Sequence, residues 1–64
     1  MTDIITAADK LACVRRELAM RKAAYPKFQA AGKISAGRAV HEIACMEAIV
    51  RDYEAMTGQE KKHQ

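Results

Sequence analysis

The chain has 64 residues, a formal net charge of +3 and only three aromatic residues, with no Trp. A single domain of this size gains roughly 3–5 kcal/mol from its core, which leaves little room for an enclosed pocket. No uncharged stretch approaches the roughly 20 residues that span a bilayer, and the N-terminus does not resemble a signal peptide, so a cytoplasmic protein without membrane contact is predicted.

The first helix is predicted over about residues 7–24. Thr6 and Asp9 have the spacing of a capping box, which places the helix start near Ala7. Arg21 is the one charge in the helix's heptad seam, where it sets register or partner choice, or simply extends its guanidinium into water. Alternating steps of three and four give this seam: Ile4, Ala7, Leu11, Val14, Leu18, Arg21, Tyr25 and Phe28.

A proline and a glycine interrupt the helical pattern. Pro26 has no amide hydrogen and disfavours helix at Tyr25, so the first helix is expected to end or kink near Ala24. A short helical turn is expected over about residues 26–31. Gly32 then has the place of the left-handed residue that ends this turn.

A second helix is predicted over about residues 36–56. Ser35 is its natural N-cap and Gly58 a natural end, and residues 59–64 are expected to form a disordered polar tail. The helix carries a broad apolar stripe made of Ala39, Ile43, Met46, Ile49, Val50, Tyr53 and Met56.

The two helices carry opposite charge. Residues 7–34 hold seven basic side chains against two acidic ones, a net charge of +5, whereas residues 35–56 hold two basic against four acidic ones, a net charge of −2. This contrast favours antiparallel pairing, so the predicted fold is an all-α helical hairpin. One hairpin covers only part of each apolar stripe, so we expect a coiled-coil-like homodimer with four helices. The core and dimer seam would contain Leu11, Val14, Leu18, Ile43, Met46, Ile49, Val50 and Tyr53.

The sequence offers no complete catalytic or metal site. His41 and Cys45 share a helix face, but zinc needs three or four protein ligands, and Cys13 would lie about 12 Å away along the hairpin. Glu42 lies off that face. The pair also lacks an orienting third group and an oxyanion hole, so we expect no enzyme and no cofactor. Both cysteines are expected to be small, buried or half-buried apolar side chains.

The basic side of the first helix is the candidate binding surface. Arg15, Arg16, Arg21, Lys22 and Tyr25 are predicted to contact a partner protein with an acidic surface. Nucleic acid is an alternative partner because arginine and lysine attract phosphates, although no aromatic residue stands between the arginines for base stacking. A third alternative is a structural module that assembles only with itself or a neighbouring protein.

Several short runs of the sequence resemble one group of proteins. The runs are Glu17 to Arg21, Tyr25-Pro26, Gly32 to Ile34, His41 to Ile43, Met46 to Ile49 and Asp52-Tyr53. Over about residues 11–53 the chain resembles short, uncharacterised proteins encoded by phages and prophages of Gram-negative bacteria. Phe28 stands where that group suggests Trp, and Cys45 where it suggests a plain aliphatic residue. That group has no assigned active site, so the resemblance transfers no functional residue, but it implies a small helical protein that binds and inhibits or modulates a host regulator or defence component.

Overall fold

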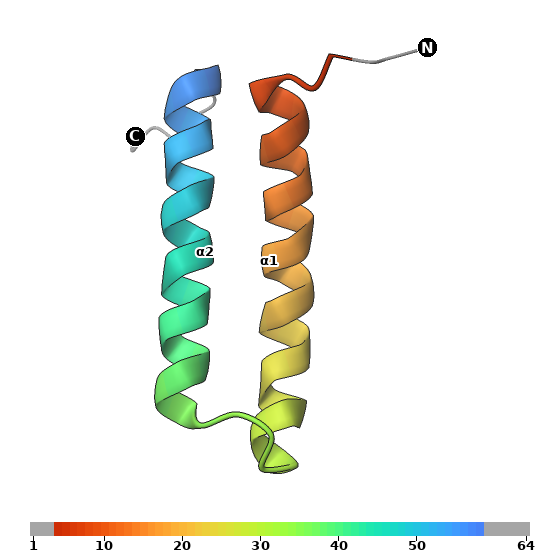
Figure 1. Ribbon diagram of the computed structural model, residues 1–64, viewed down its shortest axis with the longest axis vertical. Coiled ribbons are helices and arrows are strands. Elements are labelled where there is room, and N and C mark those ends of the chain that lie inside the picture. Colours follow the sequence, from red (N-terminus) through yellow and green to blue (C-terminus); the bar gives the residue numbers. More distant parts are fainter. Residues whose placement is uncertain (1–3, 59–64) are drawn as a thin grey trace, which may run out of the picture.

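The protein folds as two antiparallel helices that lie side by side. The computed structural model describes residues 4–58, with α1 over Ala7–Ala30 and α2 over Ala36–Thr57. Figure 1 shows that α1 begins beside the end of α2, while residues 31–35 join the helices at the opposite end. The predicted all-α hairpin is therefore confirmed. Neither helix contains an apolar stretch long enough to cross a membrane, within the part of the chain that is described.

The start of α1 is closed by the predicted capping box. The backbone N–H of Asp9 donates to Oγ1 of Thr6 at 3.1 Å, and the backbone N–H of Thr6 donates to the Asp9 carboxylate at 3.0 Å. Together these bonds satisfy two amides that would otherwise lack a partner in the first turn. The backbone hydrogen bond from Thr6, and next its side chain, lower the pKa of Asp9.

Helix α1 continues through Pro26, so the expected end near Ala24 is wrong. The helix runs six residues further, to Ala30. Proline removes only one hydrogen bond, the one that the carbonyl of Lys22 would accept. Lys22 and Pro26 are both exposed, so water can reach this carbonyl. The residues expected to form a separate short turn therefore form the last turns of α1 instead.

Gly32 takes the left-handed conformation that the sequence predicts, but at the end of α1 rather than of a separate short turn. Its φ of 73° is left-handed, a conformation that glycine adopts without a Cβ penalty. The N–H of Gly32 donates to the carbonyl of Gln29 at 3.0 Å, and the N–H of Lys33 donates to that of Phe28 at 2.8 Å. These two bonds form a Schellman motif, which turns the chain back towards α2.

Helix α2 also has the ends that the sequence predicts. The Oγ atom of Ser35 accepts a hydrogen bond from the backbone N–H of Arg38 at 3.1 Å. Gly58, with φ 73°, donates its N–H to the carbonyl of Glu54 and closes the other end. The helix is one residue longer than expected. The disordered tail predicted over residues 59–64 lies outside the described residues.

The hairpin core is small and lies along the single seam between the helices. Leu11 is 1% exposed and Ala39 4%, and Met46 and Val50 complete the buried set. Around them, four further predicted seam residues are half-buried: Val14, Leu18, Ile43 and Tyr53.

Four other residues assigned to the seam lie outside this core. Ile49 is 39% exposed because it directly precedes Val50, and consecutive helical side chains point about 100° apart. Ile4 precedes α1 and is 86% exposed. Phe28 and Met56, each near the end of its helix, are also exposed.

Candidate functional site

Three ion pairs join the basic helix to the acidic one. Arg15 lies 2.8 Å from Glu54, Lys22 3.4 Å from Glu47, and Arg21 3.7 Å from Glu42. The pairs follow the predicted charge contrast and match an antiparallel arrangement. Each exposed pair contributes about 0.2–1 kcal/mol, so their main effect is on orientation and register.

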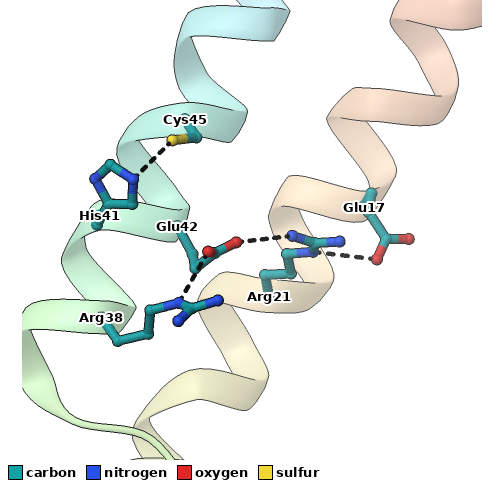
Figure 2. Close-up of polar contacts among 6 residues, drawn as sticks. All are labelled: Glu17, Arg21, Arg38, His41, Glu42 and Cys45. Carbon is teal, nitrogen blue, oxygen red and sulfur yellow. Dashed lines mark hydrogen bonds and ion pairs between the residues drawn. The ribbon is translucent and has the colours of Figure 1, made fainter.

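Arg21 is the centre of a chain of charged contacts between the helices. Its Nε donates to Glu17 at 3.3 Å, its Nη1 lies 3.7 Å from Glu42, and Glu42 also accepts from Arg38 at 3.0 Å. Figure 2 shows Glu42 reaching from α2 towards Arg21 on α1. The hydrogen bond to Glu17 raises the pKa of Arg21 above its ordinary value, so this half-buried guanidinium stays charged. This geometry fits a role in register.

The five predicted binding residues lie in different local surroundings. Lys22 and Tyr25 line a groove between the helices, whereas Arg21 and Tyr25 line a second hollow. Arg15 is bound to Glu54. Arg16 is exposed and makes no ion pair with any described residue. Three of the four basic residues therefore contact carboxylates of α2.

The groove is an open, mainly apolar feature of the described surface. It lies near the connection between the helices, residues 31–35 (the joint), and has a volume of about 340 Å³. Val40 in its wall is 70% exposed, and the Lys22–Glu47 ion pair borders it. The lining residues are Lys22, Tyr25, Pro26, Gln29, Ala39, Val40, Ile43, Ala44 and Glu47.

Sequence reasoning missed two walls of this groove. The sequence predicts that Pro26 interrupts the first helix and begins a short helical turn, which gives it no place in a groove, and Val40 lies beside the predicted stripe rather than in it. The available signal was the pair Val40 and Ala44, which are four residues apart and extend the apolar stripe of α2 to one side.

The cysteines are exposed, which corrects the expectation of buried or half-buried thiols. Cys45 precedes buried Met46, and Cys13 is two residues beyond buried Leu11, so both project away from the seam. The Sγ atom of Cys45 lies 3.5 Å from Nε2 of His41. Figure 2 shows this pair one turn apart on α2. No group of three or more histidine, cysteine or acidic side chains with metal-binding geometry occurs within residues 4–58.

Comparison with known proteins gives no further constraint on function. No protein-family model, no curated protein and no solved structure matches the chain. Function is therefore inferred from the chain's own geometry: an open apolar groove, a set of interhelical ion pairs and an exposed His–Cys pair.

Proposed function

We propose that the protein is a non-enzymatic interaction module that binds another protein in the groove beside its joint. The observation that supports this is the distribution of apolar side chains. Four hydrophobic residues are buried, whereas seven large ones are exposed in the described part of the chain. Exposed apolar surface that is rimmed by polar groups is typical of protein interaction sites.

The groove has the composition of a small binding hot spot. Tyr25 presents a large ring and a hydroxyl, and Pro26 and Val40 add apolar surface that loses no hydrogen bond on burial. The Lys22–Glu47 ion pair at the rim supplies both signs of charge to a partner. Of the five residues first predicted for partner contact, Lys22 and Tyr25 therefore remain in the proposed site. Arg16 remains available to an acidic partner outside it.

The proposed partner is a host protein in the bacterial cytoplasm, which the module would inhibit or modulate. This part of the proposal is supported by the sequence resemblance to small phage and prophage proteins described above. Nucleic acid is the less favoured partner, because Arg15, Arg21 and Lys22 already contact carboxylates of α2.

A second copy of the chain is the other candidate for the exposed apolar surface. Ile49 and Met56 are exposed on α2 and do not line the groove, so a homodimer and a groove-bound partner can coexist. Such a dimer would bury side chains that the single hairpin leaves in water.

The test is capture of partners from bacterial lysate, with and without nuclease treatment, by the wild-type chain and two matched variants. Val40→Glu places a charge in the groove wall, whereas Ala55→Glu places the same charge at an exposed position of α2 outside the groove. We expect one discrete protein to bind the wild-type chain and Ala55→Glu but not Val40→Glu. The groove assignment would be refuted if Val40→Glu and Ala55→Glu captured the same amount of the partner protein. It would also be refuted if only nucleic acid were recovered from the lysate without nuclease. Circular dichroism checks that both variants remain helical.

A further inference from the structure

We infer that His41 and Cys45 form half of a zinc site, which a second copy of the chain completes. The two side chains belong to α2 and lie one turn apart, so their ligand atoms face the same space. This inference does not depend on the groove, because neither residue lines it.

The distance between the two ligand atoms matches a tetrahedral metal. With Zn–S bonds of about 2.3 Å and Zn–N bonds of about 2.0–2.1 Å, a tetrahedral angle places sulfur and nitrogen about 3.5–3.6 Å apart. The observed distance from Sγ of Cys45 to Nε2 of His41 is 3.5 Å. A zinc ion can therefore bind both atoms without a change in their separation.

The surroundings leave this pair incomplete and accessible. His41 and Cys45 are both exposed. The nearby carboxylate of Glu42 is held by Arg38 at 3.0 Å and Arg21 at 3.7 Å, and Figure 2 shows it directed towards α1. No third potential ligand joins the pair among the described residues. A bound zinc ion would thus keep two open positions.

A second copy supplies the missing ligands by symmetry. A twofold axis through the metal presents the same histidine and cysteine again, which gives the Cys₂His₂ ligand set of structural zinc sites. Ile49 and Met56 lie one and three turns beyond Cys45, and both are exposed. They offer apolar surface beside the metal for two α2 helices to bury. Zinc binding would release the thiol proton of each Cys45 to solvent.

Cobalt(II) is the probe that reports this geometry directly. We expect reduced, untagged protein titrated with CoCl₂ to show a thiolate-to-cobalt charge-transfer band and the intense visible absorption of tetrahedral cobalt. Saturation is expected at one metal per two chains. Analytical ultracentrifugation with ZnCl₂ should show the mass of two chains, and a chelator should reverse any increase in mass that zinc causes.

Three variants make the assignment falsifiable. Cys45→Ser and His41→Ala should each lose the tetrahedral spectrum and the response of mass to zinc, whereas Cys13→Ser removes the other exposed thiol and should retain both. All three positions are exposed, so helicity should be unchanged. The proposal would be overturned if Cys45→Ser kept the tetrahedral cobalt spectrum, or if the wild-type chain showed no thiolate-to-cobalt band. It would also be overturned if each chain bound one metal ion while the measured mass stayed that of a single chain. Val40→Glu should bind cobalt as the wild-type chain does, so failure of the zinc site can be distinguished from failure of partner binding in the groove.

Discussion

Leu11 is the large side chain most deeply buried among the described residues, so we expect Leu11→Ala to destabilise the hairpin strongly. Leu11 is 1% exposed and is the one fully buried large side chain among residues 4–58. Removal of its three outer carbon atoms costs about 2.4 kcal/mol, at about 0.8 kcal/mol per buried CH₂. An unfilled cavity would raise the cost towards about 5 kcal/mol. A domain of this size has roughly 3–5 kcal/mol in total, so about half of its stability or more is lost.

Leu18→Ala is the matched control, since it makes the same change on the same helix at a half-buried position. Urea unfolding followed by circular dichroism should show a large decrease in the midpoint for Leu11→Ala and a distinctly smaller one for Leu18→Ala. Because a second copy could also stabilise the fold, the series should be repeated at several protein concentrations. Equal losses for the two variants, or an unchanged Leu11→Ala midpoint, would refute the packing register described here.

Three further predictions concern the backbone and the capping box. Gly32→Ala should destabilise the hairpin by about 1–2 kcal/mol in urea unfolding because the φ of Gly32 is left-handed. Gly37 lies within α2 with open space around it, so Gly37→Ala should stabilise the hairpin by up to about 1 kcal/mol. Stability changes of the same sign in the two variants would contradict this. Pro26→Ala restores a helical hydrogen bond, so it should increase the free energy of unfolding by up to about 3 kcal/mol and raise the thermal midpoint. A lower midpoint would show that packing of the proline ring contributes more than the hydrogen bond that proline removes. Asp9 has a lowered pKa in the folded state, so its contribution is present above its unfolded pKa of about 3.9 and is lost as pH falls through the lower folded value. Asp9→Asn should therefore flatten the decline of the thermal midpoint below about pH 4, and an unchanged decline would exclude this contribution.

Local chemistry made the helix ends predictable from the sequence. Thr6, Ser35, Gly32 and Gly58 each act through bonds to residues a few positions away, so their roles need no knowledge of the tertiary fold. Pro26 shows the limit of this approach. Its local preference is against helix, but one lost bond at an exposed position is not enough to end α1.

The candidate sites were less predictable because they depend on which helix faces which. The heptad pattern could not decide between Ile49 and Val50, and only packing against α1 assigns Val50 to the core. The basic residues looked like a shared surface in the sequence, but the hairpin pairs Arg15 and Lys22 with glutamates of α2. The His41–Cys45 spacing was visible, whereas the distance between their ligand atoms was not.

The hairpin shape also determines how the module can be attached to something larger. The start of α1 and the end of α2 lie at one end of the hairpin (Figure 1), and the residues that line the groove lie towards the other end. Helix α1 has 24 residues, which at 1.5 Å per residue gives a length of about 36 Å. A tether joined before Thr6 or after Gly58 would therefore leave the groove in the half of the hairpin away from the attachment. Surface immobilisation or fusion at either end should leave the joint open to a partner, with a reach determined by the helix rather than by a flexible linker.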